Sequence, residues 1–208
     1  LEGLKVVSME LMEAVPSASA WMADWGADVI KVEPLTGDQY RGLIKAGGAS
    51  SNVQLAGGLV SHIFQLANRN KKSLAVDLKK ESGRDIIYRM VKDADVFMTN
   101  YQLDAIKNLK MDYATLNQIN PRLIYGFLSG YGTIGPDKDE RGYDQSAAWA
   151  RSGMQYLLGE VGRPPPSQRG AVMDKTVAAH LVAGILAALL HREKTGEGQE
   201  LEVSLYHS

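Results

Sequence analysis

The sequence predicts an α/β fold with an open, mostly parallel β-sheet that carries helices on both faces. First, short β-rich runs alternate with helical stretches along the chain, the pattern of parallel strands joined by crossover helices. Second, the 208 residues are 45% hydrophobic, which is enough to bury one sizeable core. Third, the chain contains no internal repeat and no low-complexity tract, so we expect a single folding unit.

Six strands are expected from runs of apolar and β-branched residues, at 4–11, 28–32, 73–78, 95–99, 123–128 and 199–205. Helices are expected at 16–25, 81–93, 105–109, 113–119, 144–158 and from about 175 to 194. Pro16 suits the first turn of its helix, and Gly26 suits the end of that helix. The last helix is apolar on all sides, so we expect it to be buried and His180 within it to be a core residue. The glycine-rich residues 35–60 are expected to form a long functional or mobile excursion.

Composition excludes several classes of function. The net charge of −1 gives no support for nucleic-acid binding, which leaves a basic footprint. No cysteine is present and the four histidines lack metal-ligand spacing, so no metal site is expected. The uncharged apolar run 176–190 is too short to span a bilayer, and no signal peptide opens the chain, so we expect a cytoplasmic protein without membrane contact. The first strand-to-helix turn lacks the glycines of a dinucleotide site, so NAD is not expected.

Asp174 is the residue with the most specific context, because it lies just before the long apolar helix. One interpretation is an N-cap, since an Asp side chain at that position satisfies a free backbone N–H. The other is a nucleophilic carboxylate at the mouth of a cleft. Spacing alone leaves both open.

Two further segments are candidates for ligand contact. The basic run 68–73 is either a solvated turn or a contact for phosphates. Asn100 and Tyr101 follow a predicted strand, at the edge where open α/β sheets bind ligands, although Tyr101 could equally pack under the next helix.

Taken together, five strings resemble those of one family: ADWGADVIKVEP (23–34), NRNKKSLAVDLK (68–79), INPRLIY (119–125), GYD (142–144) and TGEGQ (195–199). The family is the class III coenzyme A transferases, of the carnitine-dehydratase and bile-acid-inducible type. The resemblance runs from residue 1 to residue 208. Residues 135–139, 150–153 and 203–208 are most similar to those of members that act on 2-hydroxyacyl-CoA and aryl-acyl-CoA. Members of the family have a large Rossmann-like domain and a small domain, and two chains interlock as a homodimer. The resemblance therefore implies that residues 1–208 are the N-terminal segment of the large domain, without the small domain.

The resemblance also implies a mechanism and its nucleophile. The Asp174 carboxylate would attack an acyl-CoA to give a mixed anhydride, coenzyme A would then form an aspartyl thioester, and a free carboxylic acid would take the coenzyme over. Glu13 and Val15, in the first turn, would face the acyl group, and Tyr143 and Asp144 would complete the substrate pocket. Many members have Gly before the catalytic Asp, where this chain has Met173, and the most similar subgroup usually has His after it, where this chain has Lys175.

Coenzyme A enters as the acyl-CoA co-substrate. Its contacts in the family correspond to Val76, Lys79, Asn100, Tyr101 and Arg141 of this sequence.

Two other functions fit the same fold. The first is an acyl-CoA racemase, but such members carry a His where this chain has Tyr143, and a phenol is a poor proton shuttle at neutral pH. The second is a domain that binds coenzyme A without catalysing a reaction.

Overall fold

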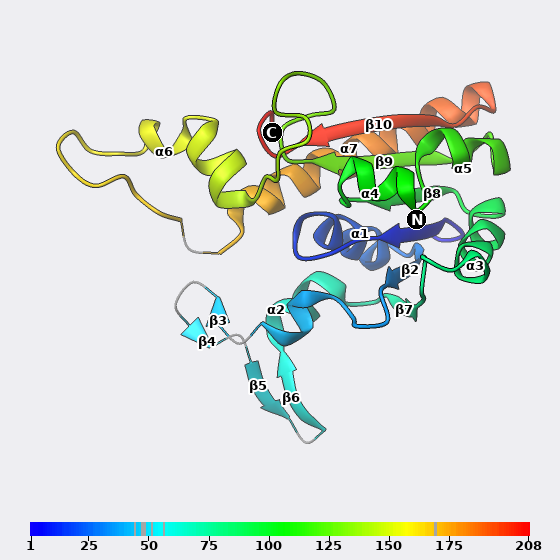
Figure 1. Ribbon diagram of the computed structural model, residues 1–208, viewed down its shortest axis with the longest axis horizontal. Helices are drawn as coiled ribbons and strands as arrows, with labels where there is room; N and C mark the ends of the chain where they lie inside the picture. The colour runs from blue at the N-terminus through cyan, green and yellow to red at the C-terminus, as the bar shows by residue number, and fades with distance from the viewer. Residues whose placement is uncertain (44, 47–48, 51, 56, 169) are drawn as a thin grey trace.

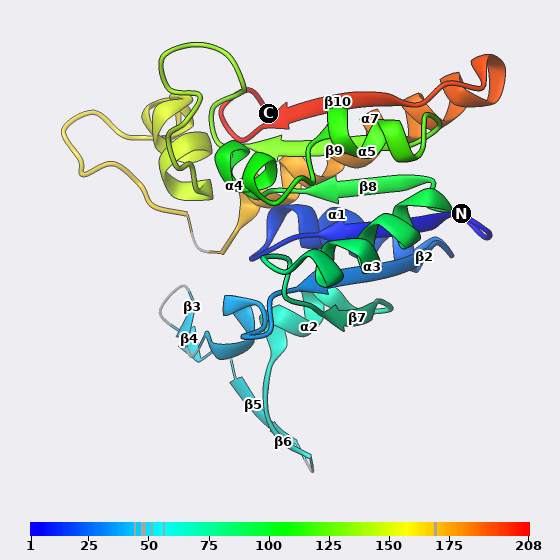
Figure 2. The same ribbon diagram turned by 45° about the vertical axis from the view of Figure 1, so that its right-hand side comes forward.

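The computed structural model describes residues 1–43, 45–46, 49–50, 52–55, 57–168 and 170–208. Its centre is a six-stranded sheet with the strand order β10-β9-β8-β1-β2-β7, in which every neighbouring pair runs parallel (Figures 1 and 2). The strands are β1 (Lys5–Met9), β2 (Asp28–Glu33), β7 (Lys72–Ala75), β8 (Val96–Thr99), β9 (Ile124–Ser129) and β10 (Gln199–Ser204). The predicted parallel sheet is therefore confirmed, with each strand shifted by at most a few residues.

Helices cover both faces of this sheet, as the sequence predicts. On one face α1 (Ala14–Asp24) packs against α7 (Val172–Thr195), which also contacts β9 and β10. The opposite face carries α3 (Glu81–Lys92), α4 (Leu103–Asn108) and α5 (Tyr113–Ile119) (Figures 1 and 2). The predicted helix 144–158 is divided into a π-helix, η2 (Asp144–Arg151), and α6 (Met154–Leu157), because Gly153 adopts a left-handed φ of 91° between them.

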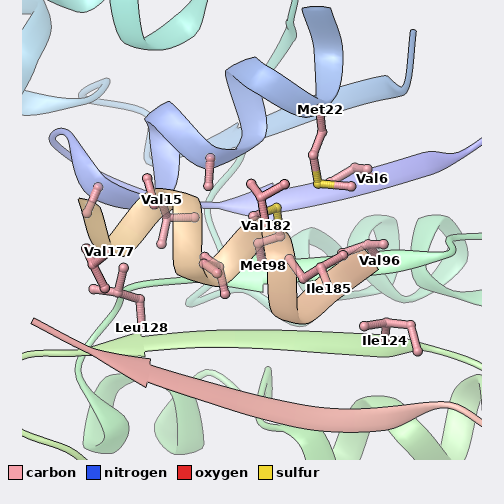
Figure 3. Close-up of a cluster of buried hydrophobic side chains, with 14 of the residues drawn as sticks. Val6, Val15, Met22, Val96, Met98, Ile124, Leu128, Val177, Val182 and Ile185 are labelled. Carbon is pink, nitrogen blue, oxygen red and sulfur yellow. The ribbon is translucent and has the colours of Figure 1, made fainter. Parts of the chain in front are cut away.

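The core has two layers because successive strand residues point to opposite faces. Val6, Val96 and Ile124 pack with α1 and α7 in one cluster (Figure 3). Val7 and Phe97, their neighbours along the strands, pack with α3, α4 and α5 in the other. Strands buried on both faces in this way have the near-continuous apolar sequences from which they were predicted.

The long helix α7 differs from its prediction. Its inward side chains, among them Val177, Leu181 and Ile185, are fully buried, but a stripe that includes Ala183 and His180 is exposed. The expectation that His180 is a core histidine is therefore wrong. By length and composition alone α7 is long and apolar enough to cross a membrane. From the sequence, the uncharged run 176–190 within it was expected to be too short for that. Its packing against α1 and the sheet makes it a core helix of this domain.

The excursion between β2 and β7 contains more structure than the sequence suggests. It holds a 3-10 helix, η1 (Gln39–Gly42), and two small antiparallel pairs that project from the sheet in both views (Figures 1 and 2). The pairs join β3 (Lys45–Ala46) to β4 (Ala49–Ser50) and β5 (Asn52–Leu55) to β6 (Gly58–Ser61). The chain then returns through α2 (His62–Asn68), which packs against α1 and was not predicted.

Candidate active site

A cavity of about 750 Å³ opens at the carboxyl ends of the strands. From β1 the strand order runs outward to β2 and β7, and from β8 it runs the opposite way to β9 and β10, so the order reverses between β1 and β8. Residues that follow both of these strands line the cavity, including Glu13 after β1 and Asn100 after β8. The reversal point of an open parallel sheet is the usual place for a ligand.

Asp174 lines this cavity from the first turn of α7. The helix starts at Val172 and its N-cap residue is Ala171, whose side chain makes no capping hydrogen bond. The N-cap interpretation of Asp174 is therefore wrong. The cap comes instead from Asp144, whose Oδ2 accepts a hydrogen bond of 2.8 Å from the backbone N–H of Asp174. Because another element supplies the cap, the Asp174 side chain is not needed for it.

The position of Asp144 depends on a close approach of two glycines. Asp144 begins η2, directly after Gly142 and Tyr143, and its side chain is buried. A Cβ on Gly142 would lie 2.5 Å from the Cα of Gly130, and a Cβ on Gly130 would lie 2.7 Å from Gly142. Only glycine allows the loop that follows β9 to return this closely to the end of the strand.

The loop that leads into α7 is held by side chains of the same region. Trp149 Nε1 and Gln155 Nε2 donate to the carbonyl oxygen of Pro166, at 2.9 and 3.0 Å. Gln145 Nε2 donates to the carbonyl oxygen of Gln168 at 3.1 Å. These contacts fix the approach to the first turn of α7, and with it the place of Asp174.

The environment of Asp174 opposes its ionisation. Burial raises its pKa most, the negative charges of Asp144 and Glu13 raise it further, and Lys175 lowers it, so that the pKa is about 7. Burial likewise raises the pKa of Asp144, although backbone N–H groups of α7 bind its ionised form. A carboxyl group with a pKa near neutrality in a cavity is a candidate for chemistry.

Glu13 and Lys175 form an ion pair on the wall of this cavity. Lys175 Nζ is bonded to Glu13 Oε1 and lies 3.1 Å from Ser17 Oγ. Ser17 Oγ itself donates to Glu13 Oε1 at 3.1 Å. Tyr40 lies nearby: burial and the charges of Glu13 and Asp174 raise its pKa above the usual range, so its phenol stays protonated. This part of the cavity wall thus combines three carboxyl groups with one ammonium group.

The turn that carries Glu13 is held by side chains from two other elements. Asn100 Oδ1 accepts from the N–H of Leu11 at 3.0 Å, and its Nδ2 donates to the carbonyl oxygen of Leu11 at 2.8 Å. Asp38 Oδ1 accepts from the N–H of Met12 at 3.3 Å, where the backbone has a left-handed φ of 67°. The amide of Asn100 therefore positions the turn, a role that its expected contact with coenzyme A did not include.

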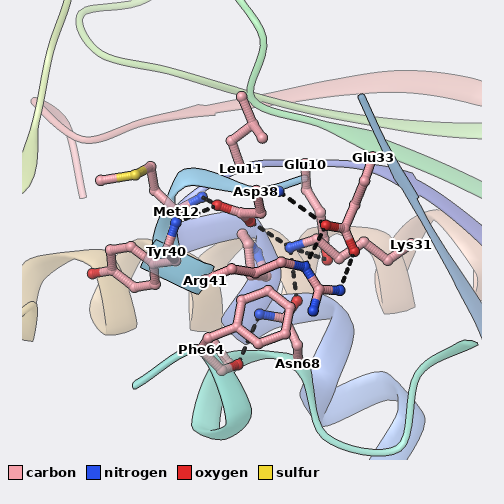
Figure 4. A network of polar contacts seen from close by, with 12 residues as sticks. Glu10, Leu11, Met12, Lys31, Glu33, Asp38, Tyr40, Arg41, Phe64 and Asn68 are labelled. Atoms are coloured by element: carbon pink, nitrogen blue, oxygen red, sulfur yellow. Dashed lines mark hydrogen bonds and ion pairs between the residues drawn. The ribbon is translucent and has the colours of Figure 1, made fainter. Parts of the chain in front are cut away.

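A buried charge network lies behind the same turn (Figure 4). Lys71 Nζ bonds to Glu10 Oε1 at 2.7 Å and to the carbonyl oxygens of Pro16 and Ala67, both at 2.8 Å. Lys31 Nζ bonds to Asp38 Oδ2 at 2.5 Å. Burial lowers the pKa of Lys71 to about 8 even though Glu10 favours its charged form.

For Lys71, neither interpretation of the basic run 68–73 holds, because its ammonium group is a buried structural cation paired with Glu10. Asn70, Lys72 and Ser73 of the same run are exposed, as a solvated turn would be.

The predicted site residues divide into two groups. Seven of them line the cavity: Glu13, Asn100, Tyr101, Arg141, Tyr143, Asp144 and the predicted nucleophile Asp174. Val15 does not, because it is fully buried in the core between α1 and α7. Val76 and Lys79 follow β7 at the same edge of the sheet but lie outside the cavity.

Sequence reasoning did not single out Ser17, Asp38 or Tyr40. These residues come together only when β1, β2 and α1 are placed side by side, and no spacing in the sequence indicates that they share a site. Among the described residues, no group of three or more His, Cys, Asp or Glu side chains could hold a metal ion.

The structure defines an open α/β domain with a carboxyl group in a cavity at the reversal point of the sheet, and comparison with known proteins identifies its family. The model for CoA-transferase family III matches residues 1–208, and the chain therefore belongs to that family. The (R)-2-hydroxy-4-methylpentanoate CoA-transferase of Clostridioides difficile is 35% identical over 211 residues, which are 100% of this chain and 51% of that protein. The cinnamoyl-CoA:phenyllactate CoA-transferase of Clostridium sporogenes is 35% identical over 206 residues, 99% of this chain and 49% of that protein.

The structural comparison agrees with the sequence comparison. A CAIB/BAIF family protein from Brucella suis superposes with a TM-score of 0.91 at 34% identity, over 99% of this chain and 53% of that one. The resemblance stated from the five strings is confirmed. The chain spans about half the length of the relatives it matches.

Proposed function

We propose that the full-length protein is a CoA-transferase that moves coenzyme A from an acyl-CoA to a free carboxylic acid, with Asp174 as nucleophile. The observation that carries the proposal is the Asp174 carboxyl group, held in the first turn of α7 on the wall of the cavity at the reversal point of the sheet. Membership of the chain in CoA-transferase family III supports it.

The reaction would proceed by two exchanges at Asp174. Its carboxylate attacks the thioester carbonyl, the carbon–sulfur bond breaks, and an aspartyl mixed anhydride and the thiolate of coenzyme A result. The thiolate then attacks the aspartyl carbonyl, which releases the first acid and leaves an aspartyl thioester. The acceptor carboxylate repeats these steps in reverse order and leaves with the coenzyme.

The fold favours these steps electrostatically. Burial weakens the solvation of the Asp174 carboxylate, and its neighbours Asp144 and Glu13 oppose its charge. Attack on the thioester removes charge from this carboxylate, so the same environment that raises its pKa also makes the covalent adduct favourable. The backbone N–H groups of the first turn of α7 add a positive dipole end to the site.

Coenzyme A would lie along the carboxyl edge of the sheet. Tyr101 and Arg141 line the cavity, and Lys79 lies farther along that edge, after β7. Cations along such an edge suit the phosphates of the coenzyme, and an aromatic ring suits its apolar parts.

The acid would carry an apolar side chain, of the 2-hydroxy or aryl type. The relatives named above act on a branched 2-hydroxy acid and on aryl acids. Leu11, Leu103 and Phe127 give the cavity an apolar wall, which suits such chains.

Trapping the covalent adduct tests this function. The full-length protein is incubated with an acyl-CoA, treated with hydroxylamine or borohydride, and mapped by mass spectrometry; modification at Asp174 is expected. Full transfer activity in Asp174→Asn would overturn the proposal. Exchange of the α-proton without any modification would point to racemisation instead.

We also propose that the full-length protein is a homodimer. Four large apolar side chains on and after α6 are exposed by 60% or more: Tyr156, Leu157, Leu158 and Val161. Apolar groups gathered in this way suit contact with further protein. Light scattering on the full-length protein would give the mass, and a monomer at micromolar concentration would contradict the dimer.

A further inference from the structure

We propose that Lys175 is a second catalytic residue, whose ammonium group donates a hydrogen bond to the oxyanion formed when Asp174 attacks the thioester carbonyl. The inference rests on the proposed transferase function and goes beyond it, because it assigns a new role at the reacting carbon. Glu13 and Ser17 are positioning residues in this scheme: they act through Lys175.

The first argument is the way in which Lys175 is held. Its Nζ has two fixed acceptors, Glu13 Oε1 and Ser17 Oγ, and both of those side chains are 98% buried. An ammonium group has three N–H bonds, so one remains after these two contacts. The Lys175 side chain is 38% exposed and lines the same cavity as Asp174. Among the described residues the third N–H has no acceptor, and the side chain that carries it lines the cavity.

The second argument is that Lys175 stands where local rules disfavour a cation. It is in the first turn of α7, next to Asp174, where the helix dipole is positive and acidic residues are favoured. A residue that breaks a local rule in this way indicates either a compensating contact or a function. Glu13 is the compensating contact, and it also holds the ammonium on the wall of the cavity that Asp174 lines.

The third argument is the balance of charge around Asp174. Of the groups that shift its pKa, Asp144 and Glu13 are negative and Lys175 is positive. The reaction brings in a thioester and develops a negative oxygen close to these carboxylates. Without a donor, that oxygen would form in a region already crowded with negative charge. A fixed ammonium in a partly water-excluded site stabilises it most effectively.

The step balances without any change in the protonation of Lys175. A lone pair of Asp174 forms the new C–O bond, and the carbonyl π pair moves to the oxygen, which accepts the hydrogen bond from Nζ. That pair then re-forms the C=O bond, the C–S bond breaks, and its electrons leave with coenzyme A as thiolate.

A simpler role would be that Lys175 only favours the ionised form of Asp174. The two roles differ at high pH. If Lys175 acts only through ionisation, the defect of Lys175→Met disappears once the pH is well above the pKa of Asp174. If Lys175 binds the oxyanion, the defect persists on the high-pH plateau.

The first experiment measures single-turnover acyl transfer to Asp174 from pH 5 to 9 in the full-length protein. For Lys175→Met we expect a plateau rate about 100-fold lower, in the range seen for loss of one oxyanion donor, with KM little changed. Lys194→Met, at the exposed far end of α7, is the matched control. A plateau rate for Lys175→Met within threefold of the wild-type rate would overturn the proposal.

A second variant separates loss of the donor from the charge left on Glu13. In Glu13→Gln/Lys175→Met the ion pair is replaced by neutral groups, so unpaired charge is no longer an explanation. We expect this double variant to remain about as slow as Lys175→Met. Recovery to the wild-type plateau would show that the pair is only structural, and the proposal would fail.

Chemical rescue guards against misfolding of the variants. The 208 residues contain no cysteine, so Lys175→Cys provides a single thiol in this segment, and 2-bromoethylamine converts it into a lysine analogue. Alkylation should restore at least a tenth of the plateau rate, whereas iodoacetamide, which adds no ammonium, should restore none. Equal recovery with both reagents would contradict the proposal.

These experiments distinguish failure of the proposed role of Lys175 from failure of the proposed transferase function. If Asp174→Asn is inactive and Lys175→Met reaches the wild-type plateau, only the role of Lys175 fails. If Asp174→Asn transfers coenzyme A normally, the transferase mechanism itself fails.

Discussion

The carboxylate of Asp144 caps the helix that carries Asp174: its Oδ2 accepts the Asp174 backbone N–H at 2.8 Å, across 30 residues of sequence. The same carboxylate is one of the charges that raise the pKa of Asp174. One side chain thus fixes the position of the candidate nucleophile and tunes its ionisation. The position and the ionisation of Asp174 are therefore both set by Asp144.

Replacing Asp144 should separate these two effects. Asp144→Asn keeps an oxygen that can accept the N–H of Asp174, so we expect little loss of stability and a lower pKa of Asp174. Asp144→Ala removes the cap as well and should cost about 1 to 2 kcal/mol, as losses of helix caps do. Urea unfolding and the pH dependence of single-turnover acylation measure the two quantities. Equal unfolding midpoints for the two variants would contradict the capping role.

The contact between Gly130 and Gly142 should be intolerant of any side chain. A Cβ on Gly142 would also lie 2.9 Å from the Cβ of Ala147, in the helix that begins with Asp144. We expect Gly142→Ala to destabilise the fold by about 1 to 3 kcal/mol, as overpacking does, and to lower transferase activity by displacing Asp144. Gly42→Ala, where a Cβ meets nothing within 4 Å, is the control. Wild-type stability and activity in Gly142→Ala would refute this account.

Two adjacent lysines should differ sharply in their contribution to stability. The side chain of Lys71 is 2% exposed and pairs with the fully buried Glu10, whereas Lys72 and its partner Asp28 are 68% and 50% exposed. Lys71→Met leaves a buried carboxylate unpaired and should cost about 3 to 5 kcal/mol. Lys72→Met should cost less than about 1 kcal/mol. Denaturant unfolding of both variants checks the difference, and similar midpoints would argue against the network.

The layout of the fold was predictable because its signals are local. Strands β1, β8 and β9 are short apolar runs, β10 alternates apolar with polar or charged residues, and residues such as Gly26 mark where elements end. Asp174 was found from its place at the start of the long apolar helix and from the resemblance of five strings. The capping by Asp144 and the pairing of Lys71 with Glu10 join residues 30 and 61 positions apart, so only the assembled sheet reveals them. The exposure of His180 was missed because an all-apolar helix gives no indication of its uncovered face.

The first chemical step should depend on pH through Asp174. Its carboxyl group must be ionised to attack, and its pKa is about 7. The single-turnover rate of acylation should therefore rise about tenfold per pH unit below 7 and become constant above it. Asp144→Asn should move this transition to lower pH, because it removes one of the negative charges. A rate independent of pH between 5 and 8 would mean that Asp174 is ionised throughout.

The contribution of Asp174 to the free energy of unfolding should fall as the pH rises, whereas the rate of acylation should increase. The pKa of Asp174 is raised from 3.8 to about 7 in the folded state, so the folded protein binds this proton more tightly than the unfolded chain. The corresponding stability is fully present below about pH 4 and is lost as the pH rises towards 7, because the folded state must then hold a buried charge. Asp174→Asn avoids that charge and should be more stable than the wild type at pH 8. The expected gain is about 2 to 4 kcal/mol, because each unit by which the pKa is raised corresponds to roughly 1.4 kcal/mol.

Urea unfolding of the wild type and of Asp174→Asn at several pH values tests this relation. The difference in free energy of unfolding should shrink steadily as the pH falls towards 4. The control is Asp139→Asn, whose carboxylate is exposed and should give no such trend. Active-site groups often lower the stability of the fold that holds them. A gain in stability together with loss of transfer in Asp174→Asn would show that the destabilising carboxylate is required for catalysis. An Asp174→Asn variant less stable than the wild type at pH 8 would show that the carboxylate is well solvated, and the electrostatic account of its reactivity would then fail.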